Sequence, residues 1–310
     1  MPDTADATQF TATDSGPIEL KDPRSAYDRP PFSEQKPIEM PGSESDMTPR
    51  PDFGQQTYTG RGRLTGLKTL VTGGDSGIGR AVALAFAREG ADVAIAYLSE
   101  SDDAAKSLEA IEAAGVRGHA KATDLQEEQN CIDLIREVHD AFGGLDVLVN
   151  NAAYQETRDA ITEVETELFD RIMKTNVYAP FWLTREAMKV MKPGASVINT
   201  VSIQAFTPSA SLLPYATTKS ALTGMTKAAA GLAMKQGIRV NAVAPGPVWT
   251  PFIPGSMEKD TIESFGGSTE FGRPAQPIEM AAAYVMLASP YEASYMTGEV
   301  VSATGGKSPL

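Results

Sequence analysis

The feature that most constrains this chain is a glycine-rich stretch, Thr72–Gly79, between an apolar run, Leu67–Val71, and a helix-like run, Ile78–Arg88. Its glycines stand at positions 73, 77 and 79. A strand that ends in spaced glycines and opens into a helix brings free backbone N–H groups and the positive end of a helix dipole to one point. We therefore predict that this turn binds a pyrophosphate, although tight turns also use glycines when no ligand is bound.

The next apolar run, Asp92–Tyr97, completes a βαβ unit of the length that dinucleotide sites use. From Leu64 onward, predicted strands and helices alternate. The strands are expected at residues 67–71, 92–97, 118–122, 145–150, 196–200, 239–243 and 299–302, and the helices at 77–89, 102–114, 127–142, 166–191, 215–236 and 277–288. Several strands are apolar on both faces, which is typical of a parallel sheet covered by helices. The pattern predicts one α/β domain over residues 61–310, a Rossmann-type doubly wound parallel sheet of about seven strands with helices on both faces.

Residues 1–60 differ from the rest because they are rich in proline, acidic residues, serine and threonine and show no sustained period. We predict that they form an extended or partly disordered arm, of which about the first 25 residues are disordered. Scattered apolar side chains between Pro30 and Tyr58 suggest that this part lies on another surface, such as a neighbouring subunit. The alternative is a mobile leader.

Composition and charge exclude several classes of function. A formal net charge of -13 argues against nucleic acid or an anionic membrane as a partner, since both need a basic face. No apolar run is long enough for a membrane span, and the N-terminus does not resemble a secretory signal. The single cysteine, Cys131, excludes an internal disulfide and fits a reducing compartment such as the cytoplasm. With only two histidines and no Cys/His cluster, we predict no metal site.

Polar residues gather where the predicted strands end, which is where ligands of such sheets bind. Among them, Tyr215 and Lys219 stand four residues apart, so a phenol and an ammonium share one helix face. A free tyrosine has a pKa of about 10, and a nearby lysine cation, aided by the positive charge of an oxidised nicotinamide ring, is expected to lower it. The Tyr215–Lys219 pair alone is weak evidence for a catalytic site, because such pairs usually lie on a solvated helix face. With Ser202 upstream and the phosphate turn, it predicts a proton-transfer site.

Taken together, these residues resemble the motifs of the short-chain dehydrogenase/reductase family in order and spacing. The matching segments are Thr72-Gly-x-x-x-Gly77-Ile-Gly79, Asn150-Asn151-Ala152, Asn176, Ser202, Tyr215-x-x-x-Lys219 and Pro245-Gly246. The resemblance covers residues 64–306. The leader, together with Ser202–Ala205 and Ala244–Thr250, resembles the glucose/ribitol-dehydrogenase-like or aldehyde-reductase-like branch. It implies an NAD(P)-dependent oxidoreductase that interconverts an alcohol and a small aldehyde, ketone or sugar. The alternative is a non-catalytic NAD(P)-binding sensor or scaffold on the same fold.

The resemblance also implies roles for four catalytic residues. Tyr215 would be the general acid in carbonyl reduction and the general base in alcohol oxidation. Lys219 would lower its pKa and hold the nicotinamide ribose, and Ser202 would hydrogen-bond the substrate oxygen. Asn176 would kink its helix and hold a water that links Lys219 to solvent, although it could equally cap a helix irregularity.

The cofactor contacts that the resemblance implies follow the strand ends. They are Gly73, Asp75, Ser76, Gly77, Ile78, Gly79, Tyr97, Leu98, Ser99, Asp124, Leu125, Asn151, Ala152, Ala153, Tyr215, Lys219, Pro245, Gly246, Val248 and Thr250. Asn150 would lie beside the adenosine ribose, and Asn151 would support the fourth strand. Neither the acidic residue typical of NAD enzymes nor the arginine typical of NADP enzymes follows the second strand, so the choice between NAD and NADP stays open.

The substrate side offers fewer signals. An aromatic and amide set suits a small carbonyl compound, and each member is equally compatible with a core position: Tyr154, Gln204, Phe206, Leu212 and Trp249. Residues 251–272 are predicted to form a mobile lid. In the family the two long helices pair across a two-fold axis, so a homotetramer is implied, with a dimer as the alternative. Packing of these helices on the sheet alone would leave no such interface.

Overall fold

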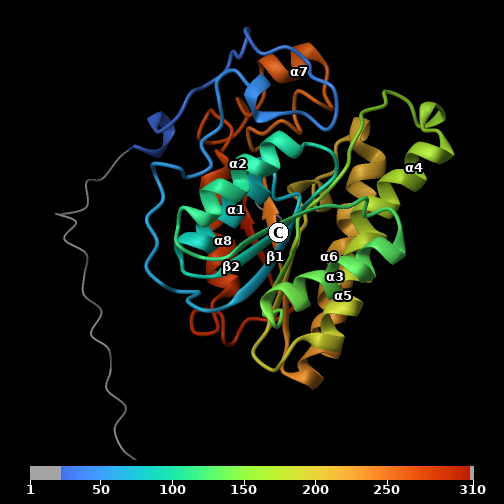
Figure 1. Cartoon of the computed structure of the whole chain (residues 1–310). Helices are drawn as coiled ribbons and strands as arrows, with labels where there is room; N and C mark the ends of the chain where they lie inside the picture. Colours follow the sequence, from blue (N-terminus) through green and yellow to red (C-terminus); the bar gives the residue numbers. More distant parts are fainter. Residues whose placement is uncertain (1–21, 308–310) are drawn as a thin grey trace, which may run out of the picture.

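The computed structural model describes residues 22–307 and contains a central sheet of seven parallel strands in the order β3-β2-β1-β4-β5-β6-β7 (Figure 1). The strands are β1 (Lys68–Thr72), β2 (Asp92–Tyr97), β3 (Gly118–Ala122), β4 (Val147–Asn150), β5 (Ser196–Thr200), β6 (Arg239–Pro245) and β7 (Val300–Ala303). The order runs outward from β1 in one direction and from β4 in the other. This is the predicted doubly wound Rossmann-type sheet, with its switch point between β1 and β4.

Helices cover both faces of the sheet. They are α1 (Gly77–Arg88), α2 (Ser101–Glu112), α3 (Glu128–Phe142), α4 (Thr166–Met173), α5 (Ala179–Val190), α6 (Leu213–Ala233), α7 (Lys259–Glu263) and α8 (Pro277–Ala288). Figure 1 shows α1, α2 and α8 on one side and α3, α4, α5 and α6 on the other. None of the helices in this described part is long and apolar enough to cross a membrane.

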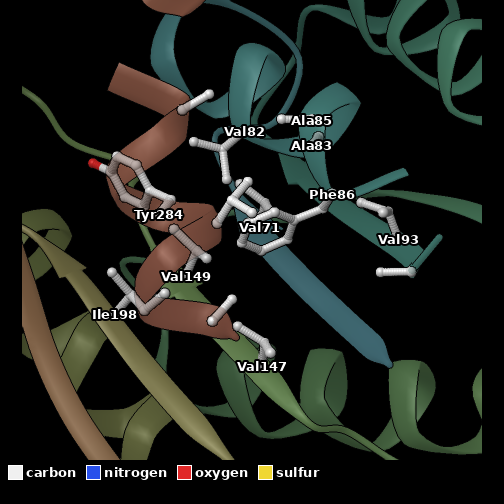
Figure 2. Close-up of a cluster of buried hydrophobic side chains, with 14 of the residues drawn as sticks. Val71, Val82, Ala83, Ala85, Phe86, Val93, Val147, Val149, Ile198 and Tyr284 are labelled. Carbon is white, nitrogen blue, oxygen red and sulfur yellow. The ribbon is translucent and has the colours of Figure 1, made fainter. Parts of the chain in front are cut away.

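The central strands β1, β2, β4, β5 and β6 are mostly buried, and neighbouring residues of a strand enter different cores. Val71 and Val149 pack with Phe86 of α1 and Tyr284 of α8, as Figure 2 shows. Leu70 and the residue preceding Val149 in β4 enter the second core, beneath α3 and α5. Each large apolar side chain buried in this way stabilises the fold by roughly 1.5–3 kcal/mol. The two cores hold the strand ends, and the loops that follow them, in fixed positions.

The predicted helix at 166–191 is interrupted. Between α4 and α5 the backbone forms a π-helical turn, Lys174–Tyr178, centred on Asn176. Pro180 follows in the first turn of α5 and has no N–H to donate to the carbonyl four residues earlier. A regular α-helical bond is therefore impossible at this point, and a wider turn replaces it. The helical segment predicted at 166–191 is thus present over residues 166–190, with its irregularity at Asn176, where a kink was expected.

The described part of the arm, residues 22–60, lies on the same chain's domain. Phe53 is buried against α1, and Phe32 and Met47 are buried beside Trp249. In Figure 1 this segment passes from the neighbourhood of α7 along the outer side of α2 and α1. The disorder predicted for the N-terminal end falls almost entirely on residues 1–21, which lie outside the described residues.

Candidate active site

A cavity of about 320 Å³ lies at the carboxyl ends of the parallel strands. Residues that follow β1, β4, β5 and β6 all line it, together with the first turns of α1 and α6. The sheet order explains this convergence, because β1 and β4 lie side by side at the switch point and their following loops diverge. The polar strand ends of the sequence therefore meet in one place.

The phosphate turn, Thr72–Gly79, joins β1 to α1. Gly73 and Gly77 have φ angles of 64° and 52°, in the left-handed region that favours glycine. A Cβ on Gly79 would lie 1.8 Å from the Gly73 carbonyl oxygen, so this close approach of helix and turn needs a residue without a side chain. The positive φ angles explain the glycines at positions 73 and 77, and the close approach of helix and turn explains the glycine at position 79.

The first turn of α1 offers backbone donors to a ligand. Among the described residues, the N–H groups of Ile78 and Gly79 form no hydrogen bond, whereas that of Arg80 bonds to the Ser76 carbonyl oxygen. Ser76 begins the helix without a side-chain cap. Burial raises the pKa of the neighbouring Asp75 carboxyl to about 6. The turn fits a pyrophosphate, because the N–H groups and the positive end of the helix dipole are both available to an anion.

At the end of β4, the structure differs from the expectation that Asn150 lies beside the adenosine ribose. Asn151 lines the cavity and donates from its amide to the Thr72 carbonyl oxygen at 3.0 Å. Asn150 is buried and donates to Asn199 Oδ1 at 2.9 Å. Successive strand residues point to opposite faces, so only one of the two can face the turn.

Ser202, Tyr215 and Lys219 come together at the wall of the cavity. Ser202 follows β5 and caps a short turn by accepting the Gln204 N–H at 3.1 Å. Tyr215 lies in the first turn of α6, and the Lys219 Nζ one turn later is 5.4 Å from the centre of its ring. Lys219 is 2% exposed and donates to the Thr200 carbonyl oxygen at 2.7 Å.

The predicted lowering of the Tyr215 pKa depends in part on the charge of an oxidised nicotinamide ring, and the groups of the protein alone act in the opposite direction. Burial raises the pKa of Tyr215 to about 12, and a hydrogen bond with the Ser202 hydroxyl opposes this rise. Burial also lowers the pKa of Lys219 to about 7, so the ammonium is itself partly deprotonated near neutrality. A lysine that loses its charge on burial, and whose Nζ bonds to a carbonyl oxygen, cannot supply the full field that the sequence argument assumed. The protein alone holds the phenol in its neutral, proton-donating form.

Asn176 lies in the π-helical turn and lines no part of the cavity. Its Oδ1 accepts the Tyr154 N–H at 2.8 Å, and its Nδ2 donates to the Tyr154 carbonyl oxygen at 2.9 Å. The same Nδ2 is 3.1 Å from Thr218 Oγ1, next to Lys219 in α6. The amide therefore joins the loop after β4 to the helix that carries Tyr215.

Most of the predicted cofactor contacts line the cavity. They are Gly73, Asp75, Ser76, Gly77, Ile78, Tyr97, Leu98, Asp124, Leu125, Asn151, Ala152, Ala153, Tyr215, Lys219, Pro245, Gly246, Val248 and Thr250. Two others do not. Gly79 packs on the turn behind the wall, and Ser99 is exposed with its hydroxyl 3.3 Å from Glu100 Oε1.

Two of the five predicted substrate residues lie elsewhere. Tyr154, Gln204 and Leu212 line the cavity, whereas Phe206 packs against the core beside α6. Trp249 is fully buried under the arm, stacked on Phe32 at 4.3 Å between ring centres. The residues on either side of Trp249 face the cavity, and alternation of an extended chain turns the tryptophan away from it.

Sequence reasoning missed several residues of the cavity wall. Three belong to the arm, Met40, Pro41 and Gly42, and others are Gln155, Arg171, Thr175, Phe252, Ile253, Met257 and Phe265. The scattered apolar residues of the arm signalled contact with a surface, but nothing local identified which surface. The predicted lid, residues 251–272, contributes four of the missed side chains, and Ile262 within it is buried beside Phe32.

Residues 73–308, more than half of the chain, match the family model described as Enoyl-(Acyl carrier protein) reductase. A solved short chain dehydrogenase from Burkholderia cenocepacia J2315, in complex with NADP, superposes with a TM-score of 0.74 at 31% identity, covering 79% of this chain and 98% of that one. The chain belongs to the short-chain dehydrogenase/reductase family.

Two relatives of this dehydrogenase/reductase extend the comparison. The oxidoreductase YghA of Escherichia coli (strain K12), named as uncharacterized, is 46% identical over 290 residues, which are 93% of this chain and 98% of that protein. NADPH-dependent aldehyde reductase 1, chloroplastic, of Arabidopsis thaliana is 43% identical over 278 residues, 88% of this chain and 96% of that protein. The short-chain dehydrogenase/reductase described here is thus an oxidoreductase acting on CH–OH groups with NAD or NADP as cofactor.

Proposed function

We propose that this enzyme interconverts an alcohol and an aldehyde or ketone, with Tyr215 as the general acid in reduction and the general base in oxidation. The observation that carries the proposal is that Tyr215, Ser202 and Lys219 line the same cavity as the glycine turn. A neutral phenol is the form that a proton donor needs, and burial favours it here.

The residues divide the reduction between them. When bound, the cofactor supplies the hydride that the substrate carbon accepts. Tyr215 Oη gives its proton to the substrate oxygen, and the Ser202 hydroxyl donates a hydrogen bond to the same oxygen, where negative charge develops. Lys219, protonated for part of the time, stabilises the phenolate that remains until a proton returns. Oxidation of the alcohol runs through the same groups in reverse.

We further propose NADP(H) and an apolar aldehyde or ketone as the preferred ligands. Support comes from the relative named as an NADPH-dependent aldehyde reductase and from the NADP complex of the solved neighbour. Leu212, Phe252 and Ile253 are apolar members of the cavity lining. Gln204 is already held by Ser209, which its amide contacts at 2.6 and 3.1 Å, so it has little left for the hydroxyls of a sugar.

The assembly and compartment expected from the sequence remain proposals. A homotetramer is supported by exposed apolar side chains on α5 and α6, Phe181 and Leu232 among them. Light scattering coupled to size exclusion should give four times the chain mass of 32.9 kDa. A cytoplasmic location fits the single cysteine, which is buried and free.

The test is oxidation of NADPH and NADH, followed by nicotinamide absorbance, against a panel of aldehydes, ketones and sugars, with an enoyl thioester included. Tyr215→Phe should lower kcat by roughly 100-fold or more while leaving the fold and cofactor affinity intact. Tyr291→Phe, which removes the same group at an exposed position outside the cavity lining, is the control. Unchanged turnover in Tyr215→Phe would reject its role, and cofactor binding without turnover of any compound would favour the sensor.

A further inference from the structure

The arm contributes part of the cavity wall. Met40, Pro41 and Gly42 line it together with the phosphate turn. The neighbouring Ile38 N–H donates to the Pro254 carbonyl oxygen at 2.9 Å. The arm thus runs between the phosphate turn and residues 251–257, which cover the substrate side. The family model begins only at residue 73, so this wall comes from outside the part of the chain that it matches.

Glu44 bonds to the phosphate turn without lining the cavity. Its Oε1 accepts the Gly77 N–H at 2.8 Å, and its Oε2 pairs with Arg80 Nη1 at 2.7 Å. Both side chains are buried, at 7% and 5% exposed, and neither lines the cavity. The Arg80 guanidinium also lies 3.9 Å from the ring centre of Phe53, a second arm residue. The arm therefore contacts the first turn of α1 at the positively charged end of the helix dipole. Burial raises the pKa of Glu44 to about 7, and Arg80 and the Gly77 N–H oppose this rise.

The same short segment is tied to α2. Asp103 Oδ2 accepts both the Ser43 hydroxyl, at 2.8 Å, and the Glu44 N–H, at 2.9 Å. Asp103 is 1% exposed, and Lys106 bonds to its other oxygen at 3.2 Å. Glu44 is consequently fixed through its backbone to one helix and through its side chain to another.

The arm is fixed at a further point to the segment that covers the site. Phe32 stacks on Trp249 and is buried with Met47 and Ile262. The Trp249 indole N–H donates to the Pro49 carbonyl oxygen at 2.8 Å. These contacts connect the phosphate turn, through the arm, to residues 249–262, although the two parts are far apart in the sequence.

We propose that residues 38–47 form part of the cofactor site. Met40–Gly42 line the cavity, and Glu44, as a positioning residue, joins the phosphate turn through the arm to residues 249–262, which cover the site. Docking of the arm and binding of the cofactor then stabilise each other by the same free energy. The inference rests on the proposed function, because it assigns this cavity to NADP(H).

The first experiment compares cofactor affinity and turnover in the full-length protein. Glu44→Ala should raise the Kd for NADPH about tenfold, within the usual range of coupling between sites, and change kcat at saturating NADPH less than about twofold. Glu34→Ala replaces the same residue type at an exposed position of the arm outside residues 38–47 and should match the unmodified protein. Glu44→Gln, which keeps an acceptor for the Gly77 N–H, should restore part of the affinity.

The effect of charge on the Kd for NADPH must be separated from the effect of arm docking, because Glu44→Ala leaves Arg80 unneutralised near an anionic ligand. The double variant Glu44→Ala/Arg80→Leu has the net charge of the unmodified protein. It should keep the weakened affinity. The unneutralised Arg80 would by itself strengthen the binding of an anionic ligand, so recovery of the original Kd in the double variant would overturn the proposal, since affinity would then not require the buried pair that docks the arm.

Hydrogen exchange gives a second, independent readout. Saturating NADPH should slow amide exchange in residues 38–47 of the unmodified protein, and the effect should be absent in Glu44→Ala. Unchanged exchange in 38–47, or a Kd for folded Glu44→Ala within about twofold of the original, would overturn the proposal. If Glu44→Ala does not fold, Glu44→Gln and the exchange data decide. An unmodified protein that binds neither NADPH nor NADH would instead reject the proposed function.

Discussion

At the scale of single residues, the burial of Lys219 lowers the stability of the folded protein. It is almost fully buried and has one hydrogen bond, to the Thr200 carbonyl oxygen. Burial depresses its pKa from 10.5 to about 7. Between these two values the unfolded chain binds the proton more tightly, so this group makes the free energy of unfolding rise as the pH increases from about 7 to 10.5. The residue is thus placed for chemistry at the expense of stability.

The Lys219→Met substitution should separate the effect of Lys219 on stability from its effect on catalysis. At pH 7 the free energy of unfolding should stay unchanged or rise by about 1 kcal/mol, because a buried charge is removed. Turnover should fall by roughly 100-fold. The rise of stability with pH above 7 should also weaken. Urea unfolding at several pH values and kcat on the same preparation measure both effects. Lys227→Met, exposed on the same helix, is the control; a loss of more than about 1 kcal/mol in Lys219→Met would contradict the argument.

At the scale of elements, sequence reasoning succeeded where the signal was local. The glycine turn, the strand ends and the Tyr215–Lys219 spacing follow from periodicities of two and 3.6 residues and from backbone requirements of glycine. It failed where the outcome depended on distant partners. Trp249 was expected in the substrate pocket because no local pattern shows that Phe32 covers it. The π-helical turn could have been suspected from Pro180, whereas the pKa of Tyr215 depends on how deeply α6 is buried.

A pair of glycines tests the packing of α1 on the turn. Gly79→Ala should lower the free energy of unfolding by about 1–3 kcal/mol and weaken cofactor binding, since its Cβ would meet a backbone oxygen at 1.8 Å that cannot easily move. Gly224→Ala, in α6 with nothing within 4 Å of the added Cβ, should raise it by up to about 1 kcal/mol. Thermal unfolding of both variants is sufficient. Equal effects of the two substitutions would refute the packing argument.

At the scale of the whole molecule, the arm makes the site depend on both halves of the chain. Cofactor and substrate walls are built from the strand ends, and the arm joins them from outside the sheet. The small cluster around Phe32 is separate from the two main cores, so its loss should open the arm locally without unfolding the sheet.

Phe32→Ala should therefore speed amide exchange in residues 30–49 and around Trp249, while exchange in β1, β4 and β5 stays slow. Its effect on the global free energy of unfolding should be smaller than the roughly 3–5 kcal/mol typical of a phenylalanine removed from a main core. Glu34→Ala, exposed in the same segment, serves as the control. Faster exchange throughout the sheet would show that the arm and the domain unfold as one unit.

The bond from the Trp249 indole to the Pro49 carbonyl spans 200 residues of sequence. A ribosome that adds 5–20 residues per second needs roughly 10–40 seconds to make that stretch. Throughout this interval Phe32 and the Pro49 carbonyl lack Trp249 as a partner, whereas Glu44 can already bond to Gly77 and Arg80. A nucleotide that binds early would therefore meet a cavity whose arm is fixed at one end only. Maturation of this enzyme is consequently a late event, completed only after the polypeptide's second half has left the exit tunnel.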